Sequence, residues 1–336
     1  MSEALGKGAV KVVATHYFSV RGLFVAREVL GARYDVTYDG AAFELELPSP
    51  KNLNGPGDPP YWASDAFGPP SSSVVGDPHQ LLSIRVVRVF SEVEFDAPAD
   101  EDERLTRAWD VVRDAAEGPR AMVSELLRGF RATHRQTWLG LSNEAPRLLY
   151  GELRDPQLDE MIVNTGPDPT VLEMRPPERA ITPADFAQAV AAITRGDMPP
   201  TAENLLSDAE YLAWNARPRD LTRAVLLAAV AAEVKVKTAL RSKCAPQLLP
   251  LVDVVLDNPR EVTLAAASLF DSAASAALGR SLRSDDRELY KRVVRLFEVR
   301  NRIAHYGEAP EPTEGADCIG AARGAFTWLD NLPSAT

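Results

Sequence analysis

Cysteine is scarce in this sequence, and its scarcity argues against two kinds of site. Only Cys244 and Cys318 occur among 336 residues, too few for the disulfide framework that stabilises many small secreted domains. No group of ligand-type residues at metal spacing surrounds either cysteine, and His16 and His79 lie far apart in the chain. We therefore predict no metal site, and we expect no cofactor.

Long apolar runs are also missing. The most apolar segment, 224–232, has nine residues, whereas a membrane-spanning helix needs about 20. The first residues, MSEALGKGAVKVV, contain neither the long apolar stretch nor the small-residue cleavage site of a secretory signal peptide. We therefore expect a cytoplasmic protein with no membrane partner.

Three motifs of nucleotide-binding and hydrolytic enzymes are absent as well. The chain has no phosphate-binding G-x-x-x-x-G-K-[ST], no dinucleotide-binding G-x-G-x-x-G and no G-x-S-x-G nucleophile motif. The sequence thus gives no support to these three classes of site.

Net positive charge is lacking too. The formal net charge of −11 argues against non-specific nucleic-acid binding by the whole surface. Basic residues nevertheless cluster, because 280–302 holds eight Arg or Lys against four acids and 217–243 holds seven against two. Two basic helices on an acidic protein permit local contact with a polyanion, although solvated helix faces explain these charge counts about equally well.

The N-terminal part of the chain has the pattern of a small β-sheet. The predicted strands are 8–15, 34–38, 42–47 and 81–96. Asp39-Gly40, between the second and third of these, is a strong hairpin signal. Residues 48–80, rich in Pro, Gly, Ser and Asp, are predicted to form a long loop or an insertion. We predict a β-rich domain over 1–100.

Helices dominate the rest of the chain. Residues 101–199 form a mixed region that either stands alone or belongs to the N-terminal domain, with predicted helices at 102–116, 119–138 and 183–195 and short strands within 145–182. From 200 to 332 all predicted elements are helices, at 202–216, 219–242, 246–257, 261–278, 285–306 and 315–331. Their short connections require antiparallel neighbours, which predicts a helical bundle. The predicted fold class is α+β.

The segment 285–306, DDRELYKRVVRLFEVRNRIAHY, carries the main functional signal. Its apolar residues recur at helical spacing, which predicts one amphipathic helix. Ser284 and Asp285 supply oxygens for an N-cap, and Gly307 is placed to end the helix.

The last turn of this predicted helix carries Arg300, Asn301 and His305. At about 100° per residue, Asn301 and His305 lie on one face, and the long side chain of Arg300 reaches the same region. A cation, an amide and an imidazole that converge at a helix end suit binding or cleavage of a phosphodiester. As a structural alternative, these residues only cap helix carbonyls and interact with the helix dipole.

A second Arg and His pair occurs in the chain at a similar spacing. Arg128 and His134 also lie on a predicted helix, 119–138, but no Asn follows the Arg and the predicted helix continues past the His. We interpret His134 as a partly exposed structural histidine. The copy at 300–305 has a stronger context, because it closes its helix and is followed by a loop and one last helix.

Residues 200–332 resemble the HEPN domain (higher eukaryotes and prokaryotes nucleotide-binding). The signature of that family is an Arg, a polar residue, three to five further residues and then a His, matched here by Arg300, Asn301 and His305. DLTRAVLLAAVAAEVKVKTAL resembles the long apolar helix of the family with one buried acid, here Glu233, and SLRSDDRELYKRVVRLFEVRNRIAHYG resembles its motif-bearing helix. The versions in bacterial abortive-infection and defence proteins are the most similar.

The resemblance implies a metal-independent endoribonuclease that acts as a two-fold homodimer. His305 would be the general acid or base, Arg300 would bind the scissile phosphate, and Asn301 would orient either of them. Glu233 would support Arg300 or His305 from the facing helix, or else form a buried structural ion pair. Tyr306, a further supporting residue, directly follows the His. Family members that are modified on Tyr carry it two residues after the His, so we do not predict this modification here.

The surrounding basic residues complete the predicted site, with Arg295, Arg302 and Lys291 as RNA-binding side chains. By the same resemblance, residues 1–199 would sense a phage-derived or cellular trigger in anti-phage defence. Two alternatives stay open: a non-catalytic module that binds RNA or a nucleotide, and a scaffold that only dimerises the N-terminal region.

Overall fold

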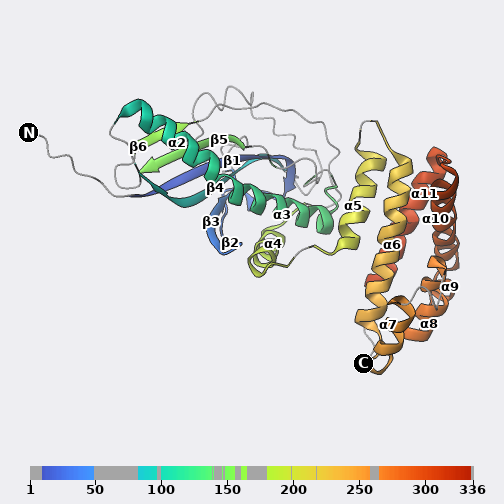
Figure 1. Ribbon diagram of the computed structural model, residues 1–336. Helices are drawn as coiled ribbons and strands as arrows, with labels where there is room; N and C mark the ends of the chain where they lie inside the picture. Colours follow the sequence, from blue (N-terminus) through green and yellow to red (C-terminus); the bar gives the residue numbers. More distant parts are fainter. Residues whose placement is uncertain are drawn as a thin grey trace, which may run out of the picture. The chain divides into compact units, whose positions relative to one another are not determined.

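The computed structural model describes residues 10–48, 82–96, 100–137, 139, 146, 148–155, 160–164, 180–197, 199–216, 218–257 and 265–333. The chain divides into two compact units, Met1–Met198 and Pro199–Thr336. As Figure 1 shows, the first unit contains a β-sheet with helices and the second is helical. The predicted α+β fold class is confirmed.

In the first unit, the described residues form one six-stranded sheet. Its strands are β1 (Val10–Val25), β2 (Arg33–Tyr38), β3 (Ala41–Glu46), β4 (Leu82–Phe95), β5 (Leu148–Asp155) and β6 (Glu160–Asn164). The strand order is β2-β3-β4-β1-β5-β6, and every neighbouring pair is antiparallel.

β1 extends well past the predicted strand 8–15. It pairs with β4 on one side and with β5 on the other, and a register shift between Ser19 and Leu23 marks a bulge within it. Because β5 and β6 come from the middle of the chain, the ranges 1–100 and 101–199 contribute to one sheet. The middle region therefore belongs to the N-terminal unit, which was one of the two alternatives from sequence.

The predicted hairpin is present as β2 and β3. Asp39 and Gly40 form its turn, with φ values of 49° and 78°, as a two-residue type I′ turn requires. From this turn the pairing runs to Arg33 opposite Glu46.

Helices α2 (Glu101–Ala115) and α3 (Glu117–His134) cover one face of the sheet (Figure 1). The side chains of Val12 and Ala14 on β1 pack against Ala108 and Val112 of α2. A 3-10 turn, η1 (Arg27–Val29), and α4 (Pro183–Arg195) complete the described elements of this unit. α4 has the predicted bounds, whereas α3 ends before the predicted 138.

In the second unit, four long helices pack together: α5 (Thr201–Trp214), α6 (Leu221–Lys243), α10 (Arg287–Tyr306) and α11 (Pro312–Asp330). Shorter pieces connect α6 to α10: η2 (Pro246–Leu248), α7 (Leu249–Asp257), η3 (Ala266–Phe270), α8 (Ser272–Leu278) and α9 (Leu282–Asp285). The predicted helix 246–257 thus begins as a 3-10 turn. The prediction of one continuous helix over 261–278 is wrong, because the 3-10 turn η3 precedes α8 and only 272–278 are α-helical. Residues 261–264 lie outside the described residues.

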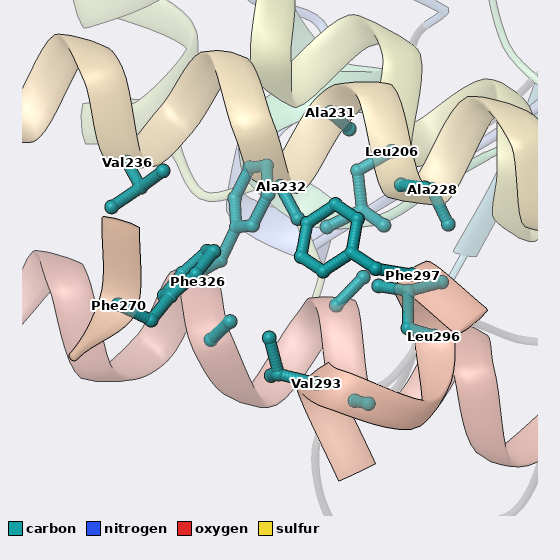
Figure 2. Packing of buried hydrophobic residues seen from close by; sticks show 14 of the residues in the cluster. Leu206, Ala228, Ala231, Ala232, Val236, Phe270, Val293, Leu296, Phe297 and Phe326 are labelled. Atoms are coloured by element: carbon teal, nitrogen blue, oxygen red, sulfur yellow. The ribbon is translucent and has the colours of Figure 1, made fainter. Parts of the chain in front are cut away.

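The core of this unit is built from small residues on α6 and large ones on the helices that face it. Figure 2 shows Ala228, Ala232 and Val236 of α6 opposite aromatic side chains of α10 and α11. The ring of Phe297 on α10 lies 6.3 Å from that of Phe270. Alanines along α6 allow close helix packing, and Leu296, Phe297 and Ile303 of α10 belong to the same core.

Candidate functional site

The predicted site lies at the C-terminal end of α10. The left-handed residue Gly307, with φ 68°, ends the helix, and its N–H donates to the carbonyl of Ile303 (2.9 Å). This is the helix end that the sequence predicted, and its geometry is the one that glycine favours.

The start of the helix differs from the prediction. Asp286, rather than Ser284 or Asp285, is the N-cap of α10, and it accepts a hydrogen bond from the N–H of Leu289 (2.9 Å). The carboxylate of Asp285 instead accepts from Trp328 Nε1 of α11 (3.0 Å). A short helix, α9, precedes α10, because Ser281 provides a separate cap one turn earlier.

Arg300 and Asn301 are in direct contact. The Nη1 atom of Arg300 donates to Asn301 Oδ1 at 2.9 Å. Arg300 follows the buried residues Leu296 and Phe297 by one helical turn, so it begins on the apolar side of α10 and is half-buried. Its guanidinium reaches the exposed Asn301, as the sequence predicted.

His305 lies on the exposed side of the same turn, four residues after Asn301. Its ring centroid is 6.4 Å from that of Tyr306, at an interplanar angle of 63°. Tyr306 is itself 76% exposed. Among the described residues, no hydrogen bond links His305 to Arg300 or Asn301, and His305 is exposed to solvent.

The three cations predicted to bind RNA are already paired with carboxylates. Lys291 Nζ lies 2.6 Å from Glu288, and Arg302 Nη2 lies 2.6 Å from Glu314 of α11. Arg295 contacts both Glu298 (3.0 Å) and Glu314 (2.5 Å).

Arg300 differs from these three side chains. In the part of the chain that the structure describes, no carboxylate pairs with it, and its guanidinium donates only to the neutral amide of Asn301. The positive charge of Arg300 is therefore available to an anion, whereas that of its neighbours is largely offset.

Glu233 does not occupy the position predicted for it. It is half-exposed rather than buried, and its carboxylate lies 2.6 Å from Lys237 on the same helix. Among the described residues of the bundle, the buried acid is Glu210 on α5, which is 5% exposed and accepts from Arg323 Nε and Nη2 of α11 at 2.8 and 2.7 Å. No hydrogen bond or ion pair joins Glu233 to Arg300 or His305 among the described residues.

Glu314 is the site residue that sequence reasoning missed. It is the third residue of α11, just before the predicted helix 315–331, and an acid in a first helical turn is normally explained by the helix dipole. Its contacts with α10 depend on helix packing, which the sequence alone did not reveal.

His134, the second candidate histidine, is buried rather than partly exposed, with 7% of its surface accessible. Its Nε2 lies 3.2 Å from Asp185 and its Nδ1 lies 2.7 Å from Thr133 Oγ1. Asp185 also closes the capping box of α4 with Thr182. His134 therefore joins α3 to the start of α4, as a structural residue does.

Other candidate sites are weaker. An apolar hollow of about 90 Å³ is lined by Leu240, Leu248, Leu251, Val252, Val255, Leu256, Ala273, Ala276 and Ala277. It includes no residue of α10 and offers no charge to a phosphate. Among the described residues, no three His, Cys, Asp or Glu side chains group as a metal site would need. His79 lies outside those residues.

Comparisons with protein-family models, with curated proteins and with solved structures give no match. Within the described part of the chain, no helix is both long and apolar enough to span a membrane.

Proposed function

We propose that the unit Pro199–Thr336 is a HEPN-type, metal-independent endoribonuclease whose site is Arg300, Asn301 and His305. The observation that carries the proposal is the state of Arg300. Of the four cations predicted for the site, it is the one without a carboxylate partner among the described residues, and Asn301 holds its guanidinium at 2.9 Å. A guanidinium that is oriented but not neutralised suits a phosphate.

The proposed reaction is attack of the ribose 2′-OH on the adjacent phosphorus atom. The 2′-oxygen gives up its proton to a base as the new P–O bond forms. The bond to the 5′-oxygen breaks, and that oxygen takes a proton from an acid. The products are a 2′,3′-cyclic phosphate and a 5′-hydroxyl, and no metal or cofactor enters the balance.

Each side chain has one part in this reaction. His305 accepts or returns a proton, and its exposure leaves it free to reach the substrate. Arg300 binds the non-bridging oxygens, where negative charge builds up in the transition state. Asn301 fixes Arg300 through its Oδ1 atom and keeps its amide N–H groups for the phosphate.

The proposal includes a homodimer formed through the helical bundle. Acid–base cleavage is most effective with two proton-handling groups, and each chain offers one imidazole at this site. A two-fold dimer would supply the second from the partner. The defence role, and a sensor role for the first unit with a phage-derived or cellular trigger, rest on the family resemblance.

A non-catalytic module that binds RNA or a nucleotide is the second candidate. Two observations favour it: within the described part of the chain no hydrogen bond orients His305, and Lys291, Arg295 and Arg302 are paired with acids. Both features weaken catalysis more than they weaken simple association. Tyr306 would then offer an exposed ring for base stacking.

The test is cleavage of a mixed RNA pool in EDTA by wild-type protein, Arg300→Ala and His305→Ala. Arg287→Ala is the matched control, because it removes the same charge at the other end of α10. We expect a loss of about 10²-fold or more in both site variants, with the control active and the products ending in 2′,3′-cyclic phosphate. Equal activity in all four proteins would contradict the catalytic assignment. RNA binding that depends on Arg300, without cleavage, would support the second candidate.

A further inference from the structure

The contact between Glu314 and two arginines of α10 has a use beyond holding two helices together. Arg295 and Arg302 are seven residues apart, so they lie on one side of α10 at a separation of about 10 Å along its axis. Oε1 of Glu314 accepts from Arg295 Nη2 at 2.5 Å and Oε2 accepts from Arg302 Nη2 at 2.6 Å. One carboxylate therefore bridges two guanidinium groups, as a phosphate would.

The charges of this group cancel. Arg295 and Arg302 face Glu298 and Glu314, which gives two positive and two negative groups. Partial burial by itself raises the pKa of Glu314, but hydrogen bonds from Arg295 and Arg302 outweigh it and hold the pKa below the ordinary value. Glu314 thus stays ionised at neutral pH, and the two arginines offer no net charge to an approaching polyanion.

The arginines are nevertheless within reach of a ligand. Their side chains are 51% and 39% exposed, whereas that of Glu314 is 20% exposed. In the described part of the chain, Arg302 contacts Glu314 through Nη2 alone, and its buried Nε atom has no hydrogen-bond partner. A single-donor contact of this kind is easier to displace than the bidentate pair between Arg323 and Glu210.

We propose that Arg295 and Arg302 form a subsite for an RNA backbone phosphate on the same helix as Arg300, and that Glu314 occupies this subsite until RNA displaces it. The inference rests on the proposed function, because it assumes that RNA binds along α10. Glu314 would then set the affinity for RNA, since each phosphate bound there has first to replace an internal carboxylate. In this role Glu314 acts through the arginines and does not touch the reacting atoms.

The experiment compares Glu314→Gln with wild-type protein in RNA binding. A fluorescein-labelled single-stranded oligoribonucleotide is titrated with the full chain, and anisotropy is measured at several salt concentrations. Asp253→Asn is the control, because it removes one negative charge from another ion pair of the same unit, with Arg241 at 3.0 Å. Both substitutions change the net charge by +1, so long-range attraction rises equally.

Glu314→Gln is expected to bind RNA about 3- to 10-fold more tightly than Asp253→Asn at low salt. Arg295 keeps Glu298 as a partner, so the freed cation is Arg302. One additional phosphate contact makes the slope of log K against log salt steeper by about 0.7 for a single strand. Adding Arg302→Gln to Glu314→Gln should remove the gain and restore the wild-type slope.

The possible outcomes separate the two proposals. If Arg300→Ala loses cleavage but Glu314→Gln binds RNA no better than Asp253→Asn, the role of Glu314 is wrong and the proposed function stands. If no variant binds RNA at low salt, both are wrong. Thermal unfolding of each protein identifies loss of fold, and an affinity gain that survives Arg302→Gln would also overturn the role of Glu314.

Discussion

His16 is a histidine that the fold of the first unit keeps neutral. It is fully buried, and its Nε2 donates to the carbonyl of Val112 at 2.9 Å. Burial lowers its pKa to about 4; the hydrogen bond to Val112 opposes this shift, and the charge of Arg120 adds to it. The cost of charging a group in the core dominates the other two effects.

The pKa shift of His16 predicts how the stability of the first unit depends on pH. In the unfolded chain His16 takes up a proton below about 6.5, but in the folded unit only below about 4. The unfolded state therefore binds more protons between these values, and the free energy of unfolding falls as the pH drops from about 6.5 to about 4. At about 1.4 kcal/mol for each pH unit, the loss reaches about 3 kcal/mol.

Hydrogen exchange of β1 amides in the full chain, followed over this pH range, measures the effect. His16→Gln cannot titrate and serves as the reference, with amides of α10 as an internal control for changes elsewhere. Wild-type protection should fall relative to the variant as the pH drops. Parallel pH curves for the two proteins would show that His16 does not set this dependence.

At the residue scale, the sequence identified the candidate site but not its electrostatic surroundings. Arg300 and Asn301 are adjacent in the sequence, and His305 follows Asn301 by four residues, so the motif can be read directly from the chain. The net positive charge of 280–302 overstated the charge available to RNA, because a count over one segment leaves out acids that other helices bring close. Glu314 comes from the next helix and offsets two of the counted cations.

Gly151 lies at a tight contact between the sheet and α2. A Cβ atom built at Gly151 on β5 would lie 2.5 Å from Cγ1 of Val112. Val112 is fully buried and β-branched, so its side chain has little freedom to move away. The two elements can approach this closely only because residue 151 has no side chain.

Gly151→Ala should therefore lower the free energy of unfolding of the first unit by about 1–3 kcal/mol, the usual cost of overpacking. Gly129→Ala is the matched control, because a Cβ atom there meets nothing within 4 Å inside α3. The control should be neutral or stabilising by up to about 1 kcal/mol. Chemical unfolding followed by circular dichroism distinguishes the two. Similar stability of both variants would mean that α2 can shift away from the sheet without cost.

At the element scale, the sequence predicted the elements whose ends are set by neighbouring residues, but not those that depend on pairing with distant strands. Thr182 and Pro183 located the start of α4, because its capping box involves residues three positions apart. The end of α10 followed in the same way from Gly307. β5 and β6 had only weak local signals, since their place in the sheet depends on β1, far away in sequence. The N-cap of α10 was wrong because three possible capping residues, Ser284, Asp285 and Asp286, follow one another.

At the scale of the whole molecule, the chain divides into two units between Met198 and Pro199, and the sequence places its own boundary at 199–200, where the wholly helical part begins. The periodicity of the sequence does not predict assembly, because self-association depends on complementary surfaces of the folded chains. The proposed function requires two copies of the site to meet in one cleft, and this requirement can be measured directly.

Mixing an inactive variant with wild-type protein tests this consequence. If cleavage requires the motifs of two chains, a ninefold excess of His305→Ala, equilibrated with wild type, should lower the activity per wild-type chain by about tenfold, because few wild-type chains find a wild-type partner. RNA is kept in excess over total protein, so that competition for substrate is negligible. Light scattering should give a mass of about twice the 36.6 kDa of one chain. Unchanged activity per wild-type chain would show that one motif suffices, and the second proton-handling group would then have to come from the same chain.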